Sequence, residues 1–232
     1  MTLIWLALCR FLTKKNVDIL SLHWAHDHVI HLKEDAQFSV FALYDMSRDE
    51  ILELRRYLNE NLSKDFIRVS HFQMIVSVFF IKKFEEELRF CVNYRNLNAI
   101  TVKNRYSLSL ISETLNRLSW AKIFIKLNII SAFNWLQIKE EDEVLIVFCT
   151  RFELFKYLVM LFNLCNESVS FQKYINNTLR EHLDKFYTAY LNDILIYFDN
   201  ELEHKIHVKL ILRKLQKADL QMNIIKCKFH VT

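Results

Sequence analysis

The chain has 232 residues and contains neither glycine nor proline. Average usage of these residues, about 7% and 5%, would place roughly 16 and 12 of them in a chain of this length. Turns that require a positive or a fixed φ must therefore be made from Asn, Asp, Ser or less suitable residues, which costs on the order of 1 kcal/mol wherever a bulkier residue adopts a glycine conformation. Such a chain either folds with few demanding turns or descends from a sequence damaged by mutation.

The composition indicates a globular protein inside the cell. Apolar residues make up 52% of the chain and aromatic residues 14%, which is ample for a buried core. The formal net charge of +4 is compatible with a polyanionic partner but does not establish one. Five spread cysteines form no C-x-x-C pair, and the apolar start is too short to span a bilayer. We expect an intracellular protein of the cytoplasm or nucleus, not secreted and without a transmembrane segment.

Residue patterns in the first half of the chain predict a helix followed by strands. Residues 47–50 read Ser-Arg-Asp-Glu, which is a capping box, and apolar residues then recur at helical spacing, so we predict a helix over 48–62. Residues 69–80 and 88–94 are rich in β-branched and aromatic side chains, which predicts two strands joined by a charged turn. Residues 123–128 alternate between apolar and polar, as in a core strand.

The second half predicts a hairpin flanked by helices. An apolar helical stripe covers residues 171–183, and two short apolar runs at 186–190 and 194–198 are joined at Asn192-Asp193. Taken alone, this Asn-Asp pair suits an ordinary hairpin turn.

A charged amphipathic helix is predicted over 201–218, and a last strand over 220–231. The helix is expected to direct Leu202, Ile206, Leu210 and Leu215 inward. Together these elements predict an α+β fold.

Four segments, in order along the chain, carry a resemblance to a known family. They are Leu88–Tyr106 (LRFCVNYRNLNAITVKNRY), Lys126–Phe133 (KLNIISAF), Phe155–Asn166 (FKYLVMLFNLCN) and Tyr190–Tyr197 (YLNDILIY). In this order they resemble the reverse transcriptases of gypsy-type LTR retrotransposons, in which the last segment reads YLDDILIY. The resemblance covers about residues 20 to 232.

The resemblance implies a right-hand polymerase fold with fingers and palm subdomains only, in which the antiparallel palm sheet packs on helices. After a tail over residues 1–20, the reverse transcriptase domain would span 21–232. The fingers would take residues 21–103 and 136–162, and the palm 104–135 and 163–232.

Three positions correspond to the carboxylates that hold two magnesium ions in the family, and two of them have changed. The family's aspartates fall on Asn128, Asn192 and Asp193. Mg²⁺ requires hard anionic oxygens, and a neutral amide cannot balance the charge of two ions. If each lost group costs about 10²-fold in rate, losing two costs at least about 10⁴-fold. We therefore expect the magnesium site to be lost and this copy to be inactive.

Six further positions match nucleotide-binding positions of the family. Cations at Lys82, Lys83 and Arg89 would suit the triphosphate, and Phe133 falls at the aromatic gate against a ribose 2′-hydroxyl. Phe162 and Gln172 lie on segments around the nucleotide and template. Without the resemblance, the lysines would be read as a solvated face and Phe133 as core.

The implied partners are an RNA or DNA template–primer and a dNTP, while the oligomeric state stays open. Two other functions remain: a polymerase component that tolerates the substitutions, and a non-catalytic nucleic-acid-binding module. Primer extension separates them.

Replacements at family positions follow one chemical rule. Each is reachable by a single C-to-T or G-to-A change from the glycine, proline, aspartate, arginine or threonine usual in the family. We hypothesise a decayed element copy, mutated by transitions of the kind that fungal genomes direct at repeats. The affected positions include Ser107, Ser109, Trp120, Ile125, Asn128, Trp135, Gln137, Ile146, Cys149, Leu161, Glu167, Ser168 and Asn192.

Overall fold

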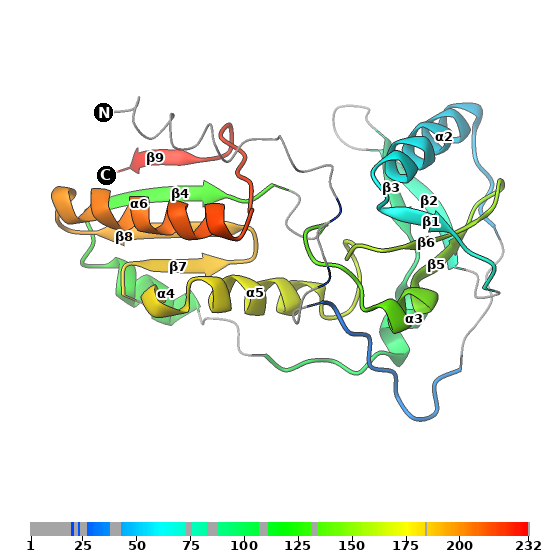
Figure 1. The fold of residues 1–232 in the computed structure, drawn as a ribbon, viewed down its shortest axis with the longest axis horizontal. Coiled ribbons are helices and arrows are strands. Elements are labelled where there is room, and N and C mark those ends of the chain that lie inside the picture. Colours follow the sequence, from blue (N-terminus) through cyan, green and yellow to red (C-terminus); the bar gives the residue numbers. More distant parts are fainter. Residues whose placement is uncertain are drawn as a thin grey trace. The chain divides into compact units, whose positions relative to one another are not determined.

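The computed structural model describes residues 20, 23, 27–37, 43–72, 76–82, 88–106, 111–130, 134–183 and 185–231. The chain forms two compact units. Unit 1 contains Arg105–Ala132 and Ser168–Thr232, and unit 2 contains Ile19–Asn104 and Phe133–Glu167. Both mix helices and sheets, which confirms the predicted α+β class (Figure 1).

Unit 2 is built on a five-stranded sheet in the order β1-β6-β5-β2-β3. All neighbouring strands are antiparallel except β2 and β5, which are parallel. The helical elements of this unit are α2 (Arg48–Ser63), α3 (Arg95–Ile100) and the 3₁₀ helix η1 (Glu140–Ile146). The strands are β1 (Ile67–Val69), β2 (Val76–Lys82), β3 (Leu88–Val92), β5 (Val147–Cys149) and β6 (Leu154–Tyr157).

The predicted strand over 69–80 corresponds to β2 and begins later than expected. The Ser70 hydroxyl accepts a hydrogen bond from the backbone N–H of Phe72 at 3.2 Å, a local turn that ends β1 before β2 begins at Val76. Aromatic rings from different strands of the sheet pack against one another. Phe148 lies 4.8 Å from Tyr157 between ring centroids and 5.8 Å from Phe90.

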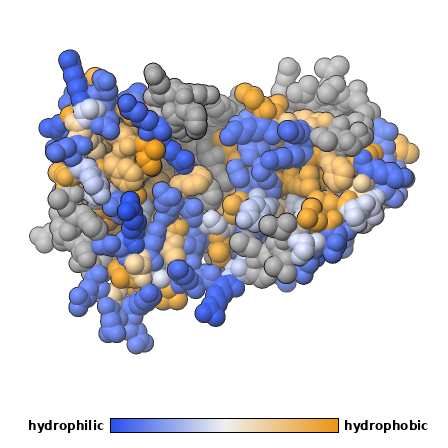
Figure 2. All heavy atoms as spheres, turned by 180° about the vertical axis from the view of Figure 1, so that it is seen from behind, coloured by the Kyte–Doolittle hydropathy of each residue, from blue (hydrophilic) through white to orange (hydrophobic). Residues whose placement is uncertain are grey.

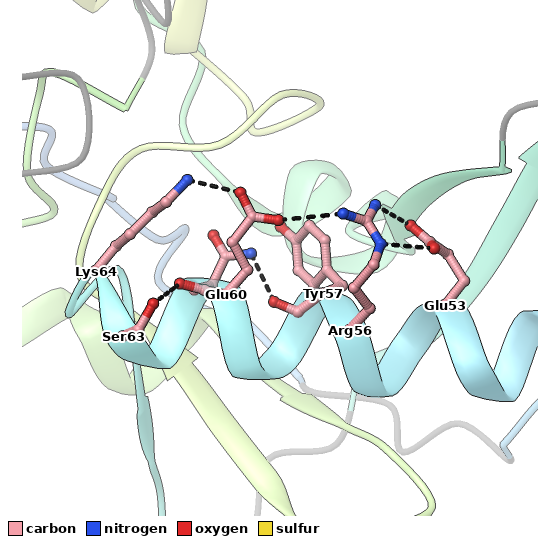
Figure 3. Close-up of polar contacts among 7 residues, drawn as sticks. Glu53, Arg56, Tyr57, Glu60, Ser63 and Lys64 are labelled. Atoms are coloured by element: carbon pink, nitrogen blue, oxygen red, sulfur yellow. Dashed lines mark hydrogen bonds and ion pairs between the residues drawn. The ribbon is translucent and has the colours of Figure 1, made fainter. Parts of the chain in front are cut away.

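Helix α2 confirms the helix predicted over 48–62 and its capping box. The Ser47 hydroxyl accepts from the Glu50 backbone N–H, and the Glu50 carboxylate accepts from the Ser47 N–H at 2.8 Å. The exposed face carries a row of ion pairs, in which Arg56 contacts Glu53 and Glu60, and Lys64 contacts Glu60 (Figure 3).

Unit 1 is built on a four-stranded antiparallel sheet in the order β7-β8-β4-β9. Its helical elements are α4 (Ile111–Leu118), α5 (Glu167–Thr178, whose first residue belongs to unit 2), the 3₁₀ helix η2 (Arg180–His182) and α6 (Glu201–Lys217). Its strands are β4 (Ile123–Asn128), β7 (Tyr187–Tyr190), β8 (Asp193–Phe198) and β9 (Lys228–Val231). The core strand predicted over 123–128 is confirmed.

The strand predicted over 220–231 forms only from Lys228 onwards, as β9, and a turn precedes it. The Asn223 carbonyl accepts from the N–H groups of Lys226 and Cys227, at 3.0 and 3.1 Å, so the chain coils once before β9 begins at Lys228. Only Met222 makes an earlier bridge, to Ile129.

Helix α6 packs on β8 with a different face from the one predicted. Leu202 and Ile206 are 72% and 62% exposed, so their predicted inward orientation is wrong, whereas Leu215 is buried. The helix carries a second stripe at helical spacing, and this stripe packs on the sheet. It consists of five buried residues: His204, Val208, Ile211, Leu212 and Leu215. Its first member, His204, is polar, so the apolar pattern of the sequence did not reveal this stripe.

The tip of the β7–β8 hairpin is Leu191-Asn192, not Asn192-Asp193. Tyr190 pairs with Asp193, which makes Asp193 the first residue of β8. Leu191 adopts φ 53°, the left-handed region that disfavours a bulky side chain.

Left-handed backbone otherwise falls on residues suited to it. Besides Leu191, the described residues with positive φ are Asp65, Asn163, Asn166 and Asp219, all Asn or Asp. Neither Glu153 nor Glu167 has a positive φ, because Glu153 directly precedes β6 and Glu167 begins α5.

Hydrophobic residues on the side turned away from Figure 1 lie in separate groups among hydrophilic ones (Figure 2). Within the described ranges, no helix combines the length and the apolar character needed to cross a membrane.

Candidate functional site

The pairing of β4 with β8 brings two predicted site residues together. Asn128, the last residue of β4, lies directly opposite Asp193, the first residue of β8. The Asn128 side-chain Nδ2 donates a hydrogen bond to Asp193 Oδ1 at 2.9 Å. Asn128 thus presents a hydrogen-bond donor, not a second carboxylate, to Asp193.

Lys126 completes this cluster from the same strand. Residues two apart on a strand share a face, so Lys126 lies beside Asn128, and its Nζ is 2.8 Å from Asp193 Oδ2. Both side chains are about two-fifths exposed, at 41% and 39%, so the pair contributes at most about 1 kcal/mol. Its chemical effect is larger, because the one carboxylate of the site is neutralised and both of its oxygens have partners.

Cys227 closes the cluster next to Asn128. Its Sγ accepts a hydrogen bond from the backbone N–H of Asn128 at 3.3 Å. Burial raises the pKa of the Cys227 thiol, and the nearby Asp193 charge acts in the same direction against the opposing Asn128 N–H and Lys126. The thiol is therefore protonated at neutral pH.

Gln172 supports the hairpin from helix α5. It is buried, its Oε1 accepts from the Leu191 N–H at 2.9 Å, and its Nε2 donates to the Ala189 carbonyl at 3.0 Å. Asn192 is half-buried, and its carbonyl accepts from the Ile129 N–H at 2.8 Å. Gln172 thus acts as a positioning residue that fixes the strained tip beside Asn192.

These residues do not fit a two-magnesium site. Only Asp193 brings negative charge, whereas Asn128 presents its NH₂ group to it and Lys126 adds a cation. In the part of the chain that the structure describes, no three His, Cys, Asp or Glu side chains gather as metal ligands.

In unit 2, the predicted nucleotide contacts Lys82 and Arg89 lie at the paired ends of β2 and β3. Lys82 ends β2 with an exposed side chain, and the Arg89 guanidinium lies 5.1 Å from the centre of the Phe162 ring. Lys83 and Phe133 lie outside the described residues.

Sequence reasoning missed three side chains at these sites: Lys126, Cys227 and Glu167. Burial raises the pKa of Glu167 to about 7, against the opposing Leu164 and Asn163 N–H groups and the Arg89 charge. The alternation on β4 could have predicted that Lys126 shares a face with Asn128. No local sequence pattern predicts the positions of Cys227 and Glu167.

The family comparison covers most of unit 1 and part of unit 2. Residues 81–232 match the family described as Reverse transcriptase (RNA-dependent DNA polymerase). The Tf2-3 and Tf2-7 transposon polyproteins of Schizosaccharomyces pombe are 34% and 33% identical to the chain over 187 residues. These alignments cover 81% of the chain but only 14% of each polyprotein.

Solved structures agree at the level of the fold. The prototype foamy virus protease–reverse transcriptase superposes with a TM-score of 0.78 at 16% identity, over 98% of this chain and 31% of that one. A foamy viral protease–reverse transcriptase in complex with an RNA/DNA hybrid superposes with a TM-score of 0.74 at 14% identity, over 96% and 32%. The predicted right-hand polymerase fold is confirmed. With its sequence relatives among transposon polyproteins, the chain belongs to the reverse transcriptase family.

Proposed function

We propose that this chain is the reverse transcriptase domain of a gypsy-type LTR retrotransposon and has lost polymerase activity. Its kinship with transposon polyproteins supports the origin, although the chain spans only 14% of their length. Unit 2 would be the fingers and unit 1 the palm, with RNA or DNA template–primer and dNTP as the ancestral substrates. Lys82, Lys83, Arg89, Phe133 and Phe162 would have contacted the nucleotide.

The loss of activity rests on the hydrogen bond from Asn128 to Asp193. An amide in this orientation donates to the carboxylate instead of adding negative charge, and the Lys126 ion pair removes the charge that is left. Two lost charged groups, at roughly 3 kcal/mol each, lower the rate at least about 10⁴-fold. What remains is a palm whose residues hold the hairpin together but do not assemble a metal site.

Undirected decay accounts for the substitutions better than selection against catalysis. The same transitions that produce Asn128 and Asn192 also remove glycine and proline along the chain. Sequencing sibling copies of the element tests this proposal, and replacements unbiased toward these transitions would contradict it.

Primer extension in magnesium tests the loss of activity. We compare the unmodified chain, the Asn128→Asp/Asn192→Asp double variant and a matched Asn116→Asp/Asn177→Asp variant. Asn116 and Asn177 are exposed residues of α4 and α5, so the matched variant has the same charge change away from the hairpin. We expect extension from the Asn128/Asn192 variant alone.

Each alternative function has its own outcome in this assay. Extension by the unmodified chain would refute the inactive state and support a tolerant polymerase component. Binding of primer–template by every variant, with extension by none, would favour a non-catalytic nucleic-acid-binding module.

A further inference from the structure

The two units differ in the sign of their charge. The segments Arg105–Ala132 and Ser168–Thr232 of unit 1 contain 14 Lys and Arg against 8 Asp and Glu. In unit 2 the corresponding numbers are 14 and 18. The mildly basic net charge of the chain thus conceals a basic unit and an acidic one, and a polyanion would be attracted to unit 1.

Three of the 14 basic residues of unit 1 counted above lie on the outer face of α6. Lys209, Arg213 and Lys217 are exposed, four residues apart, and turned away from the stripe that packs on the sheet. Within the described ranges none of the three has an ion-pair partner, whereas Lys205 contacts Glu201 at 3.0 Å and Lys214 contacts Glu181 at 2.6 Å.

Helix stabilisation explains only part of this pattern. Cations in the last turn favour the helix dipole, which accounts for Lys214 and Lys217 but not for Lys209 and Arg213, which lie before it. On the exposed face of α2, by comparison, the positive charges are balanced, since Arg56 and Lys64 are both paired with glutamates (Figure 3). The outer face of α6 is not neutralised in this way.

This face lies on the opposite side of the sheet from the candidate site. The ring of His207 on α6 contacts Phe198 at 4.5 Å between centroids. Phe198 lies five positions after Asp193 on β8, and an odd offset along a strand places the two side chains on opposite faces. A ligand on the outer face of α6 would therefore be separate from anything bound at Asn128 and Asp193.

We propose that the outer face of α6 from Lys209 to Lys217 binds the phosphate backbone of nucleic acid, independently of the candidate active site. Four residues of helix rise about 6 Å, close to the span of two nucleotides along one strand, so the three cations can follow one strand. Phosphate contacts of this kind carry no sequence preference.

The charge distribution along α6 favours a nucleic acid over an acidic membrane surface. A planar membrane would also meet the first turn, where Glu201 and Glu203 are exposed next to Leu202. A nucleic acid strand needs only the second half of the helix, where the outer face has no acidic residue.

Fluorescence anisotropy with a fluorescein-labelled DNA duplex of mixed sequence tests the proposal on the full chain. The Arg213→Gln/Lys217→Gln variant removes one Arg and one Lys from the surface, and Arg56→Gln/Lys64→Gln removes the same pair from the neutralised face of α2. Removing two phosphate contacts should make the negative slope of log affinity against log salt concentration shallower by about 1.8, measured between about 50 and 200 mM salt. The affinity itself should fall on the order of tenfold. The α2 variant should bind like the unmodified chain.

Three results would overturn the proposal. One is an unchanged salt slope in the α6 variant, and another is an equal loss in both variants, which would mean that net charge alone matters. The third is that the unmodified chain sediments with phosphatidylserine vesicles and the α6 variant does not, while both bind the duplex equally. Since Arg213 and Lys217 are exposed and have no ion pair with a described residue, folding should survive their replacement, and circular dichroism of each variant checks this.

Discussion

Glu167 begins α5 with a carboxyl group that is poorly placed for ionisation. Its Oε2 is enclosed and has no hydrogen-bond partner among the described residues, and burial raises the pKa of Glu167 to about 7 from an ordinary 4.5. Between these pH values the folded chain retains a proton that the unfolded chain releases, so stability falls as pH rises through this window and stays low above it. Full burial would make this about 3.4 kcal/mol, and partial exposure reduces it to about 2 kcal/mol.

Replacing Glu167 with Gln removes the titration while keeping the shape of the protonated acid. We expect Glu167→Gln to be about 2 kcal/mol more stable than the unmodified chain above pH 7 and nearly equal to it near pH 4.5. Urea unfolding followed by tryptophan fluorescence across this range measures the difference, with Glu140→Gln as an exposed control in the same unit. If the unmodified chain and the Glu167 variant show the same pH dependence, the carboxyl group is not buried as described.

Three further predictions concern residues described above. Asn128→Asp without magnesium should lower stability by about 1–3 kcal/mol, because it faces Asp193 with a second carboxylate in place of a donor 2.9 Å away. Thermal unfolding in EDTA measures this loss, and an unchanged midpoint would contradict the prediction. Leu191→Gly should raise stability by about 1 kcal/mol by relieving the left-handed backbone at φ 53°, whereas a loss in urea unfolding would show that the Leu191 side chain outweighs the strain. Burial lowers the pKa of His28 from 6.5 to about 4, so stability should fall by up to about 3 kcal/mol as pH drops through that window, and His28→Leu should remove this fall in acid titrations.

Local sequence patterns correctly predicted the helices and strands for which only one periodic arrangement of apolar residues is present. The capping box located α2, and the alternation at residues 123–128 located β4. Helix α6 shows the limit, because it carries two apolar stripes and only the tertiary structure decides which of them meets the sheet. The predicted tip of the hairpin differs from the observed tip by one residue. Asn192-Asp193 has the composition of a good turn, but the pairing of Tyr190 with Asp193 places the tip at Leu191-Asn192.

At the candidate site, the sequence identified the residue types but not their interactions. Motif order alone indicated that Asn128 and Asp193 would meet, and the β4–β8 register brings them opposite one another. That the amide donates to the carboxylate depends on the rotation of a side chain, which no pattern encodes. Cys227 reaches Asn128 across 99 positions in the chain, so its contact was not predictable from local spacing.

The four Asn and Asp residues with left-handed backbone have a consequence for how much chemical variety a polymerase fold requires. The described part of this chain achieves its sheets, helices and hairpins with an alphabet of eighteen amino acids. Its left-handed positions lie at Asp65, Asn163, Asn166 and Asp219, with Leu191 as the single substitute that is neither Asn nor Asp. A background with no other glycine lets each of these positions be replaced by glycine one at a time. The resulting change in stability would give the conformational cost of each site directly, which few natural proteins permit.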